Sequence, residues 1–230
     1  MKVGIIGGLG PLATAAFYKR IAERTDAVQD QEHIETLIYS RPQIPRRVEY
    51  ILGASDNSPA EMLQETASEL ERWGADTIAL PCVTAHFFYE EIAKSLKIPL
   101  LNMLEETISV LNDKNIRCVG ILGTSGTAKG GHLQRTLENA GIRYILPRSE
   151  VQEKIDSVIF DRIKCGKAVD ANVVQKITDS ILEQGAEVNL LACTELSTLN
   201  MSCPFGERYI DMMDILAKSV VKKCGKKVKE

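Results

Sequence analysis

An internal repeat limits what this chain can fold into more than any other feature of its sequence. The segment Gly4-Ile5-Ile6-Gly7-Gly8-Leu9-Gly10 returns as Gly120-Ile121-Leu122-Gly123-Thr124-Ser125-Gly126, an offset of 116 residues. Two further segments, Gly74-Ala75-Asp76 and Gly185-Ala186-Glu187, are each followed by a cysteine eight residues after the glycine, and their offset is 111 residues. We therefore expect two similar halves.

Short apolar runs alternate with amphipathic stretches in both halves. This alternation predicts an α/β fold of two pseudosymmetric, doubly wound domains, Rossmann-like or flavodoxin-like, each with a parallel sheet flanked by helices. The expected domains are 1–99 together with a returning helical tail at 207–230, and 100–206. The expected strands are 3–7, 34–40, 76–81, 117–123, 143–147 and 187–192, and the main helices between them are 12–26, 58–73, 129–140, 151–165 and 170–184.

The repeat places one thiol, Cys82 or Cys193, where an expected strand of each half ends. Ligands of open parallel sheets bind at the carboxyl ends of the strands, so two facing halves would bring both thiols to one cleft. The alternative is that the duplication copied a core position, because cysteine often serves as a small buried hydrophobe.

The charge balance and the cysteine count exclude several classes of protein. A net charge of −3 gives no positive field for a phosphate backbone, so we expect no nucleic-acid partner. No apolar run approaches the ~20 residues of a membrane span, and the N-terminus shows no leader pattern, so we expect no membrane partner and a cytoplasmic location. Six cysteines without a C-x-x-C pair favour reactive thiols over a disulfide framework.

The two repeat cysteines suit acid–base chemistry on a carbon acid. Cys82 precedes a helical run whose N-terminal dipole lowers the pKa of a thiol, and Thr194 can cap the turn after Cys193. A thiolate on one face of the substrate removes a proton, and a thiol on the other face delivers one, which inverts the carbon. The sequence shows no convincing signature for a metal, nucleotide or pyridoxal cofactor, so we expect none.

Four motifs together resemble the aspartate/glutamate racemase family, especially its aspartate racemase branch. They are Gly7-Gly8-Leu9-Gly10-Pro11-Leu12-Ala13-Thr14, Pro42-Gln43-Ile44-Pro45-Arg46-Arg47, Pro81-Cys82-Val83-Thr84-Ala85-His86 and Cys193-Thr194-Glu195. The resemblance implies a cofactor-independent amino-acid racemase, a homodimer, that acts on an acidic amino acid with Cys82 and Cys193 as its two bases.

The resemblance also implies a set of substrate-binding residues. Arg47 and Lys164 would receive carboxylates, and Thr84 and Thr194 would hold the α-carboxylate. Thr124 and Thr127 occupy the second half's counterpart of the glycine-rich turn, where hydroxyl and N–H groups suit a carboxylate or a turn cap. The remaining residues expected at this site are Gly10, Gln43 and Val83.

Val83 departs from the family pattern, which usually has asparagine after the first catalytic cysteine. Valine offers no hydrogen bond, and the loss of one polar contact in a closed site costs on the order of 1–3 kcal/mol. Because both thiols remain, we expect an altered substrate preference.

Several alternatives stay open at this point. Gly8-Leu9-Gly10-Pro11-Leu12-Ala13 fits a dinucleotide-binding turn, but the strand that follows lacks the expected acid and the matched cysteines would have no role. The two interpretations of His86 are that it tunes the Cys82 thiol and that it serves the structure; those of Glu195 are a local acid and an ion-pair partner for a buried base. Other functions that share these residues are a cysteine-dependent isomerase or decarboxylase of a small dicarboxylic acid, a non-catalytic acid-binding protein, a thiol redox pair, and a metal site from Cys82, His86, Cys193 and Cys203.

Overall fold

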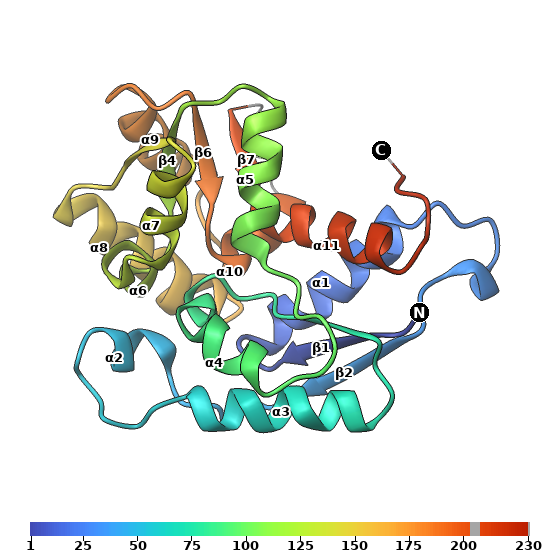
Figure 1. The fold of residues 1–230 in the computed structure, drawn as a ribbon. Coiled ribbons are helices and arrows are strands. Elements are labelled where there is room, and N and C mark those ends of the chain that lie inside the picture. The colour runs from blue at the N-terminus through green and yellow to red at the C-terminus, as the bar shows by residue number, and fades with distance from the viewer. Residues whose placement is uncertain (203–207, 230) are drawn as a thin grey trace.

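The computed structural model of the chain describes residues 1–202 and 208–229, and it contains two parallel β-sheets. In the first half the strand order is β2-β1-β3, and Ile78 of β3 also bridges to Leu100 in parallel. This sheet lies in the lower part of Figure 1. Its elements are β1 (Val3–Gly7), α1 (Pro11–Arg24), η1 (Asp30–Glu32), β2 (Thr36–Ser40), α2 (Arg47–Ile51), α3 (Ala60–Arg72), β3 (Thr77–Ala79), η2 (Thr84–Phe88) and α4 (Tyr89–Lys94).

The second half builds a four-stranded sheet with the order β5-β4-β6-β7, in the upper part of Figure 1. Helix α5 leads into it and α11 follows it. Its elements are α5 (Met103–Asp113), β4 (Cys118–Leu122), α6 (Ser125–Gly130), α7 (His132–Asn139), β5 (Arg143–Ile145), α8 (Ser149–Ser157), the π-helical turn η3 (Val158–Ile163), α9 (Ala171–Leu182), β6 (Val188–Leu191), α10 (Thr194–Ser202), β7 (Tyr209–Asp211) and α11 (Met212–Lys223).

Strands β1, β3 and β4 are buried along their whole length, and the residues of β1 and β4 alternate between separate core clusters. Val3 and Ile5 of β1 face a central cluster that also holds Val119 and Ile121 of β4, whereas Ile6 faces an outer cluster under α3. Leu122 faces a third cluster under α8 and α9. This period of two follows from the strand geometry. The central cluster joins the two halves through apolar residues of α1, α5 and α11, so the halves share one core.

The predicted α/β fold class is confirmed, and the ends of the expected elements shift by a few residues. One element differs from the expected helical tail: residues 209–211 form β7, which pairs with β6 in the second sheet. Helix α11 follows directly because the Asp211 side chain accepts hydrogen bonds from the N–H groups of Met213 and Asp214. It packs against both α1 and α5 (Figure 1). The division into domains 1–99 with 207–230 and 100–206 stays a prediction. It assigns residues 209–211 to the first domain, whereas β7 pairs within the second sheet.

Among the helices that the structure describes, none combines the length and the apolar character that a bilayer crossing requires.

Candidate active site

The carboxyl ends of strands from both sheets meet at one small cavity. It has a volume of about 40 Å³, which leaves room for at most a few water molecules. Both repeat cysteines line it, and each is almost fully buried, with Cys82 8% and Cys193 7% exposed. The first half contributes Leu9, Arg47, Val48, Cys82, Val83 and Thr84, and the second contributes Thr124, Phe160, Lys164, Cys193, Thr194 and Glu195.

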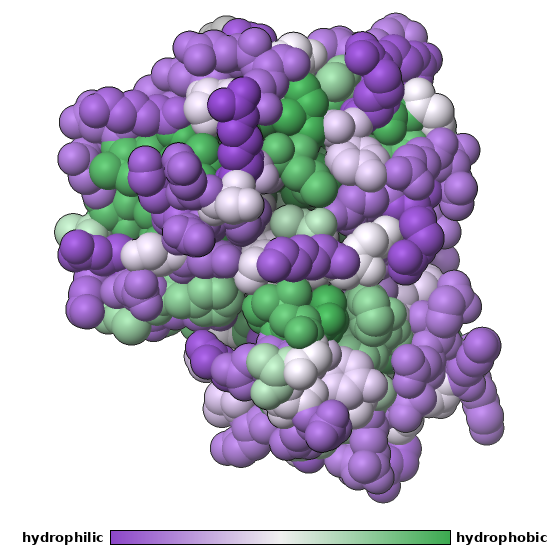
Figure 2. All heavy atoms as spheres, turned by 90° about the vertical axis from the view of Figure 1, so that its left-hand side faces the viewer, coloured by the Kyte–Doolittle hydropathy of each residue, from purple (hydrophilic) through white to green (hydrophobic). Residues whose placement is uncertain are grey.

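An open cleft of about 470 Å³ adjoins this cavity. The two share a wall formed by Leu9, Arg47, Val48, Phe160 and Lys164, so these side chains separate the thiols from the solvent side. Figure 2 shows the side of the molecule that carries α2 and α8, where apolar residues form several patches in a largely hydrophilic surface.

The Cys82 loop is held through its backbone. The Cys82 carbonyl accepts hydrogen bonds from the Ala85 N–H at 3.1 Å and from Nδ1 of His86 at 2.9 Å. Nε2 of His86 accepts from the Met103 N–H at 3.1 Å, so the proton of the neutral ring is on Nδ1. Burial lowers the pKa of His86 to about 4, so the imidazole is neutral at pH 7. His86 therefore contacts the Cys82 carbonyl and positions the loop.

Cys193 has a charged neighbourhood. Its thiol donates to Oε2 of Glu195 at 3.1 Å, and the other carboxylate oxygen of Glu195 forms a close ion pair with the Lys164 ammonium. Burial, and then the Glu195 charge, raise the pKa of Cys193 well above its usual value, while Lys164 opposes the rise. Cys193 is therefore a neutral thiol at pH 7. Glu195, foreseen as an ion-pair partner, pairs with Lys164.

Three threonine hydroxyls join the halves beside the cavity. The Thr84 hydroxyl lies 3.1 Å from that of Thr124 and 3.0 Å from that of Thr127, and the latter two are 3.4 Å apart. Thr124 also caps α6 by accepting from the Thr127 N–H. Thr84 and Thr124 line the cavity, whereas Thr127 lies buried behind them. The Thr194 hydroxyl, at the cavity wall, is 3.4 Å from Oε2 of Glu195.

Arg47 reaches the cavity wall, and its terminal nitrogens bind backbone carbonyls. Nη1 donates to Pro45 at 2.9 Å and to Ile44 at 3.3 Å, and Nη2 donates to Leu9 at 3.1 Å. The guanidinium thus ties the glycine-rich turn to the loop before α2. Any carboxylate that binds Arg47 bidentately has to compete with these carbonyls.

Gly10 and Gln43 have different positions. Gly10 lines the outer cleft, and a Cβ there would come within 2.5 Å of Oε1 of Glu195, so a side chain at this turn would displace the carboxylate of the ion pair. Gln43 is exposed and lies outside the walls described for the cavity and the cleft. Val83, 1% exposed, lines the cavity and packs into the central core cluster.

Sequence reasoning missed Leu9, Val48 and Phe160 as wall residues. Phe160 lies in the π-helical turn η3, and the run VIFDRIKCG carries no pattern that distinguishes this turn from an ordinary amphipathic helix. His132 was also missed, although its Nε2 lies 2.9 Å from the Val83 carbonyl. A lone histidine at the start of a helix gives no sequence signal for such a contact.

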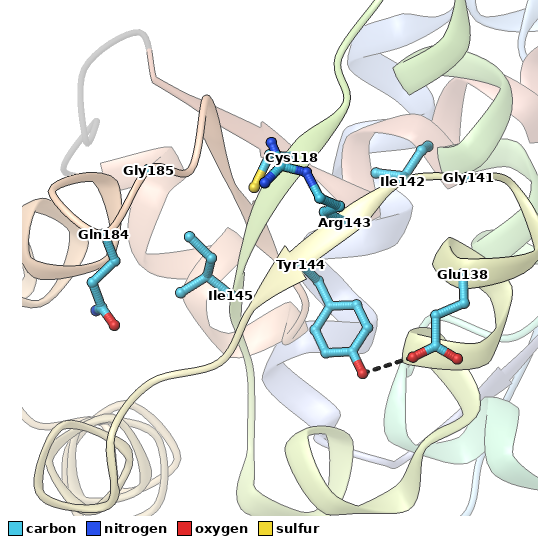
Figure 3. Close-up of a pocket in the computed structure, with 9 residues that line it drawn as sticks. All are labelled: Cys118, Glu138, Gly141, Ile142, Arg143, Tyr144, Ile145, Gln184 and Gly185. Atoms are coloured by element: carbon cyan, nitrogen blue, oxygen red, sulfur yellow. Dashed lines mark hydrogen bonds between the residues drawn. The ribbon is translucent and has the colours of Figure 1, made fainter.

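The other cysteines lie apart from the cavity. Cys118 and Cys224 are buried, Cys165 is exposed, and Cys203 lies outside the described residues. Cys118 stands at the amino end of β4 and lines a larger hollow of about 780 Å³ beside the edge strand β5, where the Tyr144 hydroxyl donates to Glu138 (Figure 3). This hollow lies at the opposite ends of the strands from the two repeat thiols.

Comparisons with known proteins agree with this architecture. A family model described as Asp/Glu/Hydantoin racemase matches residues 6–220. The broad specificity amino-acid racemase RacX of Bacillus subtilis (strain 168) is 28% identical over 223 residues, covering 95% of this chain and 96% of that protein. The structure of Picrophilus torridus aspartate racemase matches with a TM-score of 0.85 and 30% identity, over 99% of this chain and 96% of that one.

Glutamate racemase from Campylobacter jejuni subsp. jejuni shares the fold at 18% identity, with a TM-score of 0.60 over 100% of this chain and 87% of that one. Since the family model spans most of its residues, the chain belongs to the Asp/Glu/Hydantoin racemase family. By family it is an amino-acid racemase, and therefore an isomerase.

Proposed function

We propose that this protein interconverts the L- and D-forms of an acidic amino acid, aspartate or glutamate, by proton transfer between Cys82 and Cys193 without a cofactor. The observation that carries this proposal is that the two thiols of the repeat, one from each half, line the same cavity. The working form is a cytoplasmic homodimer whose cavity lies between the two domains of the repeat.

In the proposed reaction the thiolate of one cysteine removes the α-proton, and the thiol of the other delivers a proton to the opposite face of the carbanion. Cys193 is suited to begin as the proton donor, because burial and Glu195 hold it protonated. Cys82 then acts as the base for one enantiomer. The roles are reversed for the other enantiomer, and exchange with solvent resets the two protons.

Substrate binding in this proposal uses the charged wall between the cavity and the cleft. The Lys164 side chain is 28% exposed and borders both spaces, so a substrate carboxylate can share its ammonium with Glu195. Arg47 binds a substrate carboxylate when its guanidinium gives up hydrogen bonds to backbone carbonyls. Thr84, Thr124 and Thr194 offer hydroxyls to the α-carboxylate. Thr127 supports them from behind, and Gly10 lines the cleft through which substrate enters, whereas Gln43 lies outside the described walls. Because the cavity is so small, the shared wall must move when substrate enters.

A second candidate is a racemase of neutral amino acids. It is favoured by the apolar side chains of Leu9, Val48, Val83 and Phe160 in the cavity wall. The resemblance to the broad specificity racemase RacX points the same way. In this case the proton transfer is unchanged, and only the side-chain preference differs.

The test offers L- and D-aspartate, glutamate and alanine in D₂O and follows inversion by chiral chromatography and deuterium uptake at Cα by NMR. We expect Cys82→Ala and Cys193→Ala each to lose inversion by roughly 10²–10⁴-fold. Cys118→Ala, which removes a buried thiol at the far strand ends, is the matched control and should retain the parent rate.

Each contrary outcome favours a different alternative. If both single variants still invert at the parent rate, the two-base assignment is wrong. Binding of the acid without deuterium uptake would indicate a non-catalytic acid-binding protein. Formation of a decarboxylated or geometrically isomerised product would indicate the related isomerase or decarboxylase chemistry.

A further inference from the structure

We propose that His132 is a positioning residue for Cys82, which fixes the position of this thiol relative to the half that carries Cys193. This inference rests on the proposed two-cysteine reaction. His132 belongs to the second half, at the start of α7, yet its imidazole donates to the carbonyl of Val83, the residue after Cys82.

The contact is buried and its direction is defined. Nε2 of His132 lies 2.9 Å from the Val83 carbonyl, and since a carbonyl only accepts, Nε2 carries the proton. The side chain is almost fully buried, with the residue 7% exposed. The ring is neutral at pH 7, because burial lowers the pKa of His132 to about 4. His132 therefore offers a fixed, uncharged donor.

Two glycines let His132 occupy this position. Gly131, with φ at 73°, is in the left-handed region and forms the junction between α6 and α7. At Gly130 a Cβ would come within 2.9 Å of the imidazole Nδ1. Side chains at these two positions would strain the junction or displace the ring, so the local sequence Gly130-Gly131-His132 is adapted to deliver this donor.

His86 and His132 together fix two consecutive peptide groups of the Cys82 loop. His86 binds the carbonyl of Cys82, which orients the peptide between Cys82 and Val83. His132 binds the carbonyl of Val83, which orients the next peptide. The two restraints have different origins, because His86 belongs to the same half as the loop and His132 to the opposite half. Among the hydrogen bonds of the described residues, the Thr84 hydroxyl contacts join a side chain of this loop to the other half, and the His132 bond joins the loop backbone to it.

Because the His132 imidazole donates to the Cys82 loop, loss of this donor should affect the two enantiomers of the substrate differently. A displacement of about 1 Å at a reacting group costs on the order of 10²-fold in rate. Cys82 would be displaced, while Cys193 keeps its own contact with Glu195. Inversion needs both thiols and should fall in both directions. Deuterium uptake with retention, which needs only one thiol, should persist for the enantiomer that Cys193 deprotonates and fall for the other.

The experiment compares His132→Leu, which removes the donor, with His132→Gln, whose amide nitrogen can replace Nε2. His33→Leu, at an exposed histidine, is the matched control. For each variant, inversion and α-deuterium uptake are measured separately from L- and D-substrate in D₂O. We expect the leucine variant to invert roughly 10²-fold more slowly. Its deuterium uptake should be lost mainly from one enantiomer, the same one as in Cys82→Ala and the opposite one to that in Cys193→Ala. The glutamine variant should recover at least tenfold of the loss, and His33→Leu should match the parent.

Two results would overturn the proposal: parent-like inversion in His132→Leu, or an equal loss of uptake from both enantiomers. If the leucine variant does not fold, His132→Asn takes its place, because the shorter amide does not reach the Val83 carbonyl, and the comparison with His132→Gln stands. Failure of the proposed function gives a different pattern, because then the parent itself does not invert, or the cysteine variants invert at its rate.

Discussion

Cys82 and Cys193 occupy the same place in the repeat, but different parts of the protein control them. Cys193 is held by charge: its thiol donates to Glu195, which is paired with Lys164. The Cys82 loop is held by its backbone, through carbonyls that accept from two buried, neutral imidazoles. The two copies share the end of the strand and the turn that follows it, but their side-chain contacts differ, so Cys193 is controlled by charge and Cys82 by backbone geometry.

The largest expected effect is a loss of folding stability at acid pH, where the two histidines that hold the Cys82 loop become protonated. His86 and His132 have pKa values of about 4 in the folded protein, and the ordinary value is 6.5, because burial disfavours the charged rings. Between these pH values the unfolded chain binds protons that the folded chain does not. The free energy of unfolding should therefore fall as the pH drops from about 7 to about 4, by roughly 3 kcal/mol per histidine.

Urea unfolding at a series of pH values measures this slope. His132→Gln removes one of the two titrating rings, so its unfolding free energy should depend less steeply on pH than that of the parent. Identical slopes in the two proteins would show that the buried imidazole does not couple folding to protonation.

The next effect concerns the glycines that occupy equivalent places in the two halves, Gly10 and Gly126. A Cβ at Gly10 would meet Oε1 of Glu195 at 2.5 Å, whereas at Gly126 it would meet side-chain carbons of Val48 and Thr84 at 3.0 and 3.1 Å and the Cα of Val48 at 3.1 Å. Gly10→Ala should therefore displace the carboxylate and lower kcat/KM by about 10²-fold. Gly126→Ala should lower it less, because its neighbours need to shift only slightly. Steady-state kinetics measures both variants. If kcat/KM falls more in Gly126→Ala than in Gly10→Ala, the Glu195 carboxylate does not control the Cys193 side as argued above.

The sequence alone predicts the fold class well, because strand periodicity is a local pattern and the repeat can be found by comparing the sequence with itself. It also predicts which two cysteines line one cavity, since each follows an apolar run that ends at the carboxyl edge of its own sheet. The partners of the polar groups are less predictable. Nothing in the spacing of Arg47 shows that its guanidinium binds the carbonyls of Leu9, Ile44 and Pro45, because these contacts depend on how three loops pack.

Contacts between the halves are the hardest to foresee. His132 and Val83 are 49 residues apart, and their hydrogen bond exists only once the two sheets have docked. The strand β7 was missed for a related reason: its three residues are too few for a periodic pattern, and it pairs with β6 only within the assembled sheet. The roles of the residues at the cavity stay predictions that the experiments above test.

A smaller effect is expected when the charge beside Cys193 is removed. Glu195→Gln takes away the carboxylate that helps to raise the pKa of Cys193, so that pKa should fall. If Cys193 must be protonated to donate, the alkaline limb of the rate profile then shifts to lower pH, with a loss of about tenfold at pH 8. Glu183→Gln, at an exposed glutamate, is the control. An unchanged alkaline limb in pH–rate profiles would exclude electrostatic control of Cys193 by Glu195.

The smallest expected effect concerns substrate selectivity, and it tests whether the residue that follows Cys82 sets it. Val83 lies beside Cys82, is 1% exposed, and packs into the core cluster that joins the halves. Val83→Asn introduces an amide that can bind a substrate carboxylate, and one such contact is worth about 1–3 kcal/mol. The ratio of kcat/KM for aspartate to that for alanine should rise about tenfold, while the free energy of unfolding falls by about 1 kcal/mol because part of the amide is buried.

Competition assays with mixed substrates, together with urea unfolding, measure both quantities for Val83→Asn. Val83→Thr, which keeps the branched shape, controls for the change of volume and should alter the ratio less. If asparagine leaves the ratio unchanged, the residue after Cys82 does not set selectivity. Discrimination would then have to come from the wall that Phe160, Lys164 and Arg47 share with the cleft, which the second half controls in part.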